Sequence, residues 1–129
     1  MTEPVPARKI SILVVDDNEG IRENAKALFE AYGFSVDTAV DRFTAQSKLS
    51  ATHFDVLLSD VRMPGAASGL EAGVILANWV LKNQPTVKVV LSSCTPKEWI
   101  KGIPEGIIFF DKTKSLIPFI KELLGEDLS

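Results

Sequence analysis

Five short apolar runs recur along the chain, at Ile10–Val15, Phe34–Ala39, Val56–Ser59, Val87–Leu91 and Ile107–Phe110. Each run is too short for a helix, and β-branched residues are common among them. Four of the runs are apolar almost throughout, which is typical of strands buried on both faces, whereas Phe34–Ala39 alternates between apolar and polar positions. The pattern therefore predicts five strands.

The segment after the first strand has the spacing of a helix. Ile21, Ala25, Leu28 and Tyr32 fall on one face, and Gly33 stands where a C-terminal cap belongs. An apolar stripe that ends at a glycine predicts a helix packed against the sheet.

Three further helical segments are predicted. Asp41 can cap the second helix, Gly69–Lys82 forms the third, and Ser115–Leu124 forms the last, closed by Gly125. The third helix is apolar on more than one face, so Trp79 belongs either to the core or to an exposed patch for a partner, and we favour the core.

Buried strands that alternate with helices require a parallel sheet, because each crossover returns along the outside of the sheet and covers one face. We therefore predict an α/β protein with five strands and about five helices. In an open parallel sheet, reactive groups gather at the carboxyl ends of the strands. The strand assignments thus also predict where a functional site lies.

The composition fits one domain. The chain has 129 residues, of which 46% are hydrophobic, enough for a core of its own. We expect a flexible leader at residues 1–8, the domain at residues 9–125 and a short tail at residues 126–129. No apolar stretch approaches the roughly 20 residues that cross a bilayer. The first residues do not read as a signal peptide, so we expect a cytoplasmic protein without a membrane partner.

The content of charged residues, cysteine and histidine argues against two further kinds of protein, those that bind nucleic acid and those with a zinc site. Lys and Arg number 14 against 17 Asp and Glu, and they are spread along the chain, which argues against direct binding of nucleic acid. Cys94 and His53 are single residues of their types, so a zinc site built from cysteine and histidine is excluded. We expect His53 to lie at the surface without a role.

Polar side chains follow four of the predicted strands at their carboxyl ends. They are Asp16 and Asp17 after the first strand, Asp60 after the third, Ser92 and Ser93 after the fourth, and Asp111 and Lys112 after the fifth. Clustered carboxylates raise each other's pKa unless a cation lies among them. Oxygen ligands without cysteine or histidine suit a hard cation, and Mg²⁺ is the one we expect.

A metal ion beside a lysine and a hydroxyl is suited to phosphoryl transfer, with one carboxylate free to attack phosphorus. Asp60 is the best candidate nucleophile, because Met63 and Pro64 fix the loop after it, whereas Asp16 and Asp17 lie together as a metal clamp. The predicted chemistry is the formation of an aspartyl phosphate. Taken alone, each of these acids has a simpler interpretation as a helix cap or a loop residue, and only their shared register favours a site.

The polar motifs follow one another in a recognisable order. They are Asp16-Asp17, Asp60-Val61-Arg62-Met63-Pro64, Ser92 after an apolar strand, and Lys112. This ordered set resembles the receiver domain of two-component response regulators, over residues 9 to about 125. The resemblance implies a flavodoxin-like, doubly wound sheet with strand order 2-1-3-4-5, and a stand-alone receiver similar to the chemotaxis regulators. It also implies that the protein is no separate enzyme and catalyses only its own Mg²⁺-dependent phosphorylation and dephosphorylation.

The resemblance assigns roles to the matching acids. Asp60 would accept the phosphoryl group from a histidine kinase or a phosphotransfer protein. Asp16, Asp17, Asp60 and the backbone carbonyl of Arg62 would hold Mg²⁺.

The same resemblance assigns roles to residues on the fourth and fifth strands. Ser92 and Lys112 would bind phosphoryl oxygens, and we favour Ser92 over Ser93 because it follows the apolar run directly. Phe109 occupies the place of the switch aromatic and, together with Ser92, would relay phosphorylation to an unknown downstream protein. A second copy of the chain also stays open as a partner.

Three features depart from the usual pattern of this family. The loop Gly65–Ser68 is one residue longer. The segment between Ser92 and Lys112 is about two residues shorter, which predicts a brief fourth helix around Trp99. Thr113 replaces the proline that usually follows the lysine, so we expect a trans peptide bond, because a cis bond before another residue costs about 2.5–4 kcal/mol.

Other interpretations stay open. A receiver-like interaction module that is never phosphorylated is the main alternative, motivated by the three departures. A phosphatase or hydrolase with an aspartyl phosphate ranks low, because Arg62 stands where such enzymes carry a second Asp, and a flavin protein ranks low because the clustered acids would repel the flavin phosphate. Cys94 can be a small buried filler or a shield for the acyl phosphate, and Trp99 can pack inside or form a responsive surface.

Overall fold

The computed structural model describes residues 9–128, so the predicted leader at residues 1–8 lies outside the described residues. Five parallel strands form one sheet in the order β2-β1-β3-β4-β5. The strands are β1 (Ser11–Val15), β2 (Ser35–Ala39), β3 (Val56–Asp60), β4 (Lys88–Ser93) and β5 (Ile108–Asp111). The predicted α/β class, the parallel sheet and its strand order are therefore confirmed.

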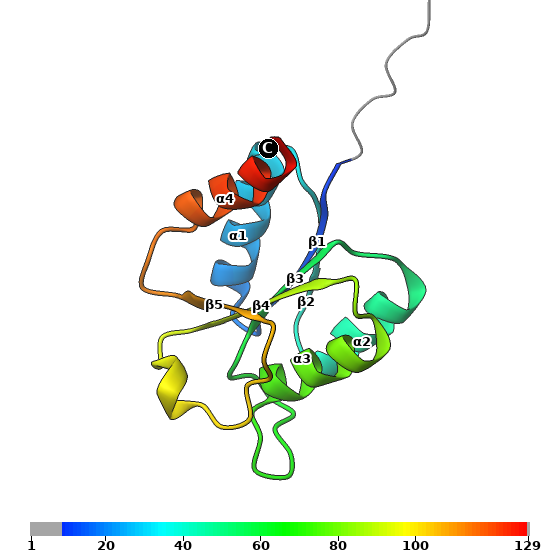
Figure 1. Cartoon of the computed structure of the whole chain (residues 1–129), viewed down its shortest axis with the longest axis vertical. Coiled ribbons are helices and arrows are strands. Elements are labelled where there is room, and N and C mark those ends of the chain that lie inside the picture. Colours follow the sequence, from blue (N-terminus) through cyan, green and yellow to red (C-terminus); the bar gives the residue numbers. More distant parts are fainter. Residues whose placement is uncertain (1–8, 129) are drawn as a thin grey trace, which may run out of the picture.

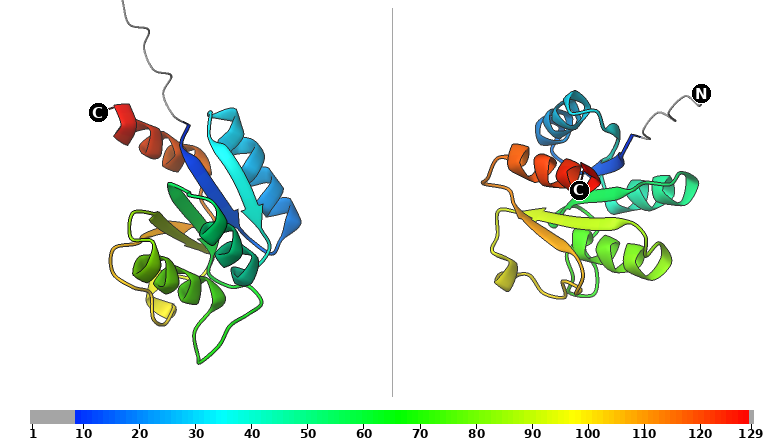
Figure 2. Two further views of the ribbon diagram at one scale, coloured as in Figure 1. Left: turned by 90° about the vertical axis from the view of Figure 1, so that its right-hand side faces the viewer. Right: turned by 45° about the horizontal axis from the view of Figure 1, so that its top comes forward.

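Four α-helices cover the sheet in the described part of the chain. They are α1 (Glu19–Ala31), α2 (Arg42–Ala51), α3 (Ala72–Asn83) and α4 (Leu116–Leu128). α1 and α4 lie on one face, and α2 and α3 lie on the other (Figure 1, Figure 2). Within residues 9–128, no helix combines the length and the apolar character that a membrane span needs.

The brief fourth helix predicted around Trp99 is a single 3₁₀ turn, η1 (Lys97–Trp99). The prediction of about five helices is thus corrected to four α-helices and one turn within the described residues. Pro96 precedes this turn, and Gly102 and Pro104 follow it, which leaves too few residues for a stable helix. Trp99 ends the turn and is 77% exposed, so it does not pack inside.

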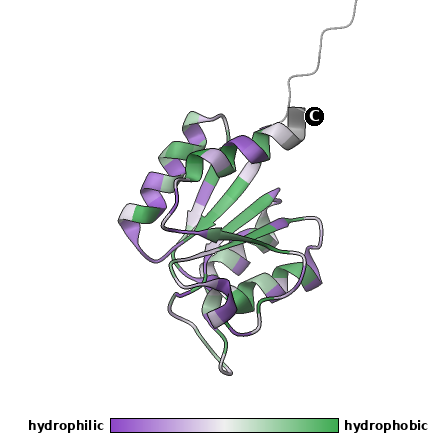
Figure 3. Ribbon diagram, turned by 60° about the vertical axis from the view of Figure 1, so that its left-hand side comes forward, coloured by the Kyte–Doolittle hydropathy of each residue, from purple (hydrophilic) through white to green (hydrophobic). Residues whose placement is uncertain are grey.

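Alternate residues of the central strands enter two separate cores. On β1, Leu13 and Val15 pack beneath α2 and α3, whereas Ile12 and Val14 pack beneath α1 and α4. A strand sends successive side chains to opposite faces, so a strand covered on both sides must be apolar throughout. Figure 3 shows this concentration of apolar residues on the strands. Trp79 is half-buried against the core beneath α2 and α3, as predicted.

Local sequence sets several helix ends. The Asp41 side chain caps α2 as predicted and accepts a hydrogen bond from the Thr44 N–H at 2.7 Å. Asn18 caps α1 by accepting from the Ile21 N–H at 2.9 Å. Gly33 follows α1 with φ 91°, a conformation that costs glycine least, so its predicted place at the end of the helix is confirmed.

Two helix ends differ from the prediction. α3 begins at Ala72 instead of Gly69, because Ser68 and Gly69 have φ of 54° and 78° and cannot join a right-handed helix. α4 continues through Gly125 to Leu128, so residues 126–128 of the expected tail are helical. Gly125 is absent from the glycines with positive φ, and without that conformation a glycine does not cap a helix.

Candidate functional site

The carboxyl ends of β1 and β3 bring the three predicted acids together. One carboxylate oxygen from each of Asp16, Asp17 and Asp60 lies within 4.8 Å of the others. Asp16 follows β1 directly and is 3% exposed, Asp60 ends β3 and is 8% exposed, and Asp17 is exposed to solvent. The acidic cluster is thus formed by two nearly buried carboxylates and one at the surface.

Lys112 brings a positive charge to the acidic cluster. Its Nζ lies 2.7 Å from Asp16 Oδ2 and 3.3 Å from Asp60 Oδ2. The Lys112 backbone N–H donates to the Ser93 carbonyl at 3.1 Å, which holds the end of β5 against β4. The peptide bond between Lys112 and Thr113 is trans, as predicted.

Ser92 lies beside Asp60 in the register of β3 and β4. It is buried, and its hydroxyl donates to the Ser59 carbonyl across a long 3.4 Å. The Ser93 hydroxyl instead accepts a hydrogen bond from the Thr95 N–H at 3.0 Å. Of the two serines, Ser92 is therefore the one whose strand position is paired with Asp60.

Burial and neighbouring charges shift the pKa of two groups in the site. Burial raises the pKa of the Asp60 carboxyl and the Asp16 charge raises it further, while Lys112 and the Arg62 backbone N–H oppose the shift. Burial lowers the pKa of Lys112, but the hydrogen bond to Asp16 and the charges of both acids outweigh it and raise the pKa above its usual value. The lysine is thus a cation at neutral pH, and its charge offsets only part of the rise in the Asp60 pKa.

The donor set of the acidic cluster fits a hard divalent cation. Its three members offer carboxylate oxygens alone, and such ligands suit Mg²⁺. His53 precedes β3, whose opposite end carries Asp60, and it is exposed and pairs with Asp55 at 3.3 Å. Cys94 is exposed, so its interpretation as a buried filler is wrong.

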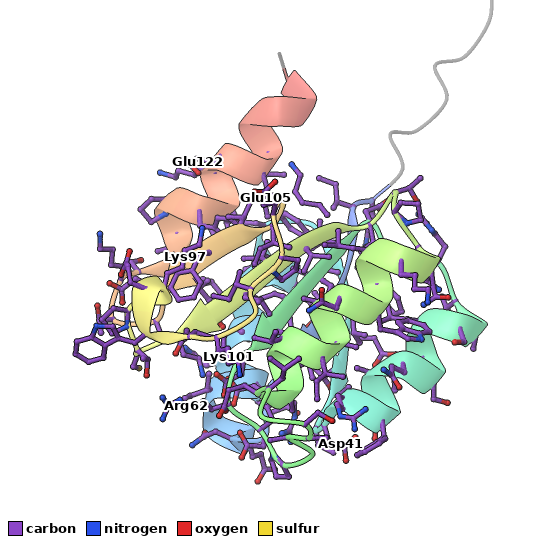
Figure 4. All side chains as sticks on the ribbon, turned by 60° about the horizontal axis from the view of Figure 1, so that its bottom comes forward. Asp41, Arg62, Lys97, Lys101, Glu105 and Glu122 are labelled. Atoms are coloured by element: carbon purple, nitrogen blue, oxygen red, sulfur yellow. The ribbon has the colours of Figure 1, made fainter. Side chains whose placement is uncertain are left out.

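Arg62 lies beside Asp60 and Phe109 lies on β5, but the roles of both residues stay predictions. The Arg62 backbone N–H reaches the Asp60 carboxylate. The Arg62 side chain is exposed and extends outward from this end of the molecule (Figure 4). Phe109 lies on β5 beside Leu91 of β4, and it is half-buried against the core beneath α2 and α3.

Two residues that support Asp16 were missed by sequence reasoning. The Asn18 N–H donates to Asp16 Oδ1 at 2.9 Å, and Arg22 Nη1 donates to the Asp16 carbonyl at 2.9 Å. Asparagine directly before a helix is a recognisable cap, which is the signal that could have found Asn18. Arg22 carries no such signal, because nothing in the helical pattern distinguishes it from an exposed cation.

A cavity of about 720 Å³ opens beside the acidic cluster, between α1 and α4. Ala25, Leu28 and Ile117 contribute apolar walls, and Asp16 and Lys112 belong to the same lining. The two site residues are therefore reached from an open, largely apolar hollow.

Comparison with known proteins shows the family. The family model described as the response regulator receiver domain matches residues 12–103. Protein PilG of Pseudomonas aeruginosa is 32% identical over 117 residues, which cover 90% of this chain and 83% of PilG. The chain belongs to the response regulator receiver family, whose members are signalling domains of two-component systems.

Solved structures agree with the fold. The signal receiver domain of an HD domain-containing protein from Pseudomonas fluorescens matches with a TM-score of 0.81 at 21% identity, covering 97% of this chain and 91% of that one. The response regulator protein TrrA of Thermotoga maritima, in complex with Mg²⁺ and BeF, matches with a TM-score of 0.78 at 23% identity, covering 90% and 97%. The resemblance to a flavodoxin-like receiver is thus confirmed for the fold.

Proposed function

We propose that Asp60 is the phosphoacceptor of this receiver, and that Asp16, Asp17, Asp60 and the Arg62 carbonyl bind Mg²⁺. The observation that carries the proposal is the position of Lys112 Nζ, 2.7 Å from Asp16 and 3.3 Å from Asp60. One ammonium beside clustered carboxylates is an arrangement suited to a phosphoryl group and a cation. The similarity in fold to TrrA, which was solved with Mg²⁺ and BeF, supports it.

The phosphoryl group comes from a phosphohistidine on a sensor histidine kinase or a phosphotransfer protein. A carboxylate oxygen of Asp60 forms the new bond to phosphorus as the phosphorus–nitrogen bond breaks, and the imidazole leaves with the electron pair. Bound Mg²⁺ supplies positive charge for the phosphoryl oxygens. The protein thus catalyses its own phosphorylation, with the phosphohistidine protein as the donor.

Lys112 and Ser92 respond to the new group. Lys112 exchanges its contact with Asp16 for a phosphoryl oxygen, and the Asp16 carboxylate would then be one of the groups that hold Mg²⁺. The Ser92 hydroxyl gives up its long bond to the Ser59 carbonyl, a weak bond at 3.4 Å, and turns to another phosphoryl oxygen. Movement of the loop after β4 changes the space for Phe109, and the population of the signalling conformation rises for a downstream protein.

Phosphorylation by a small donor tests the proposal. The protein is incubated with Mg²⁺ and acetyl phosphate, and its intact mass is measured at acidic pH. We expect the mass gain of one phosphoryl group in the wild type and none in Asp60→Asn. Asp37→Asn, the same substitution at an exposed acid of β2, is the matched control and retains the gain.

The competing function is a receiver-like interaction module that is never phosphorylated. It is favoured by the single turn η1 and by Thr113 in place of the usual proline. If the wild type gains no mass and beryllofluoride with Mg²⁺ leaves its amide spectrum unchanged, the module is the better description.

A further inference from the structure

The β3–α3 loop (residues 61–71) follows Asp60 and depends on other elements for its position. Gly65, Ser68 and Gly69 have φ of 106°, 54° and 78°. Ala67 and Leu70 exchange backbone hydrogen bonds of 3.1 and 2.9 Å, which close a turn at the far end of the loop. These internal bonds shape the tip. At the end nearest Asp60, the Val61 N–H donates to the Ser92 carbonyl at 3.0 Å and the Val61 carbonyl accepts from the Gly73 N–H at 2.9 Å, so the stretch between Val61 and Ala67 is held by neither set of bonds.

Arg42 in the first turn of α2 contacts that nearer part. Its Nε donates to the Gly65 carbonyl at 2.8 Å, a contact between residues 23 positions apart. The Arg42 guanidinium also lies over the Phe43 ring, 4.1 Å from its centre. A Cβ added at Gly65 would lie 3.1 Å from the Phe43 ring and 3.3 Å from Arg42 Nε, so the loop rests directly on this helix turn.

The contact at Gly65 is close to the acceptor along the chain. Val61 and Met63 are buried, which anchors the side chains on either side of Arg62. The Arg62 backbone N–H reaches the Asp60 carboxylate, and its carbonyl is the expected fourth Mg²⁺ ligand. Along the chain, Arg62 therefore lies between Asp60 and Gly65, which Arg42 holds. Figure 4 shows this side of the molecule, with Arg62 and the α2 cap Asp41 labelled.

The other side of the loop is covered as well. A Cβ added at Gly102 would lie 2.6 Å from Leu70 Cδ2, so the segment after η1 packs closely on the loop. That contact lies beyond Gly69, at the helix end of the loop. Between that contact and the bonds of Val61 to β4 and α3, Arg42 holds the loop from outside at Gly65.

We propose that Arg42 is a positioning residue that holds the β3–α3 loop at Gly65, so that the Arg62 backbone faces Asp60 and the bound cation. This inference rests on the Mg²⁺ site proposed above. Arginine suits the task because its planar group donates from Nε and stacks on an aromatic ring at the same time, whereas lysine offers a flexible point charge.

The first test needs no metal. Hydrogen exchange is measured at the amides of residues 62–69 in the metal-free wild type, Arg42→Ala, Arg42→Lys and Lys48→Ala. Lys48 is the matched control, since it lies on the same helix and donates to the Thr38 carbonyl, away from the loop. We expect roughly tenfold faster exchange in both Arg42 variants, as local opening becomes easier, and no change in Lys48→Ala.

The second test measures Mg²⁺ affinity by calorimetry and the phosphorylation rate with acetyl phosphate. Removing a group that orients metal ligands weakens metal affinity by about 10–100-fold. Arg42 acts less directly, through the loop backbone, so we expect its variants to lose roughly 3–10-fold in Mg²⁺ affinity. At saturating Mg²⁺ the maximal rate should stay within about twofold, because the acceptor and Lys112 are unchanged.

The outcomes separate the two proposals. A wild type that binds no Mg²⁺ would overturn the proposed function together with this inference. Normal wild-type binding, with the same Mg²⁺ affinity or the same loop exchange in both Arg42 variants, would overturn the role of Arg42 alone. A weaker affinity in Lys48→Ala would show a general effect of α2 and would also refute it.

Discussion

Lys112 Nζ bridges Asp16 Oδ2 and Asp60 Oδ2 at 2.7 and 3.3 Å, so one ammonium joins the loop after β1 to the end of β3. All three side chains are largely buried, at 16%, 5% and 11% exposure. In the metal-free protein Lys112 is therefore the internal counter-ion of the two acids. Mg²⁺ bound at the proposed site would compete for the Asp16 carboxylate, so the lysine and the cation would be in part interchangeable.

Replacing this counter-ion should destabilise the metal-free protein. Lys112→Met leaves two buried carboxylates without their counter-ion, and we expect a loss of roughly 3 kcal/mol in the free energy of unfolding, the low end for a broken buried ion pair. Saturating Mg²⁺ should restore most of the loss, because the ion stabilises the folded state that binds it. Urea unfolding with and without MgCl₂ measures both values.

The neighbouring Lys114→Met is the control for this variant, because Lys114 is exposed. It should change the free energy of unfolding by less than about 0.5 kcal/mol. An equal loss in Lys112→Met with and without Mg²⁺ would contradict the idea that the ion and the lysine substitute for each other.

Asp60→Asn should stabilise the metal-free protein in a pH-dependent way. Burial raises the pKa of Asp60 above its usual value of 3.8, so the folded chain binds this proton more tightly than the unfolded chain. Ionised Asp60 therefore lowers the free energy of unfolding at neutral pH. The loss disappears at a pH well below the usual pKa of aspartate, where Asp60 is protonated in both the folded and the unfolded chain. Asn carries no charge, so the free energy of unfolding of the variant should exceed that of the wild type by on the order of 1 kcal/mol near neutral pH. In strong acid the two values should be equal.

The measurement is urea unfolding of the wild type and of Asp60→Asn, in a chelating buffer, at a series of pH values from neutral to strong acid. Asp37→Asn should show the opposite sign. Burial raises the pKa of Asp37, but the hydrogen bonds from Lys48 and the Thr38 N–H, together with the Lys48 charge, outweigh burial and hold this pKa below its usual value. A constant difference between wild type and Asp60→Asn at every pH would refute the electrostatic explanation.

Gly73→Ala should disturb the backbone at Asp60, where α3 packs against the end of β3. A Cβ at Gly73 would lie 2.1 Å from the Asp60 carbonyl oxygen and 2.7 Å from Val61 Cα, both of them backbone atoms that cannot rotate away. α3 must then shift off β3, and we expect a loss of about 2–3 kcal/mol, as for other overpacked cores. Gly125→Ala, in α4 with open space around it, should instead gain about 0.5–1 kcal/mol from helix propensity. Chemical unfolding of both variants tests the pair, and a neutral Gly73→Ala would disprove the close approach.

The acidic cluster could be predicted from the sequence because one rule covers it. Asp16, Asp60 and Lys112 each follow a recognisable apolar strand, and parallel strands end at the same edge. Ser92 was placed beside Asp60 by the same reasoning, and the register of β3 and β4 agrees. The positions of these residues required only that the strands be assigned within a residue or two.

The rest depends on contacts between distant segments, which periodicity does not encode. The bond from Arg42 to Gly65 joins residues 23 positions apart through a loop of irregular conformation. Gly33 and Gly125 both follow helical patterns, but only Gly33 adopts the positive φ of a cap, and tertiary packing decides which does. The close approach of Gly73 to β3 had a signal, a glycine within an apolar helix, that could have been followed.

The exposed Trp99 allows a test of the shortened segment between β4 and β5. At 77% exposure its ring buries little surface, so Trp99→Ala should change the free energy of unfolding by less than about 0.5 kcal/mol. Ile120→Ala, at a fully buried position of α4, should cost about 2–5 kcal/mol in the same assay.

Tryptophan fluorescence gives a second test of the same exposure. In Trp79→Phe the remaining emission, from Trp99, should be that of a tryptophan in water, whereas Trp99→Phe should leave the blue-shifted emission of half-buried Trp79. A large loss of stability in Trp99→Ala, or a blue-shifted Trp99, would mean that a longer helix covers this ring after all.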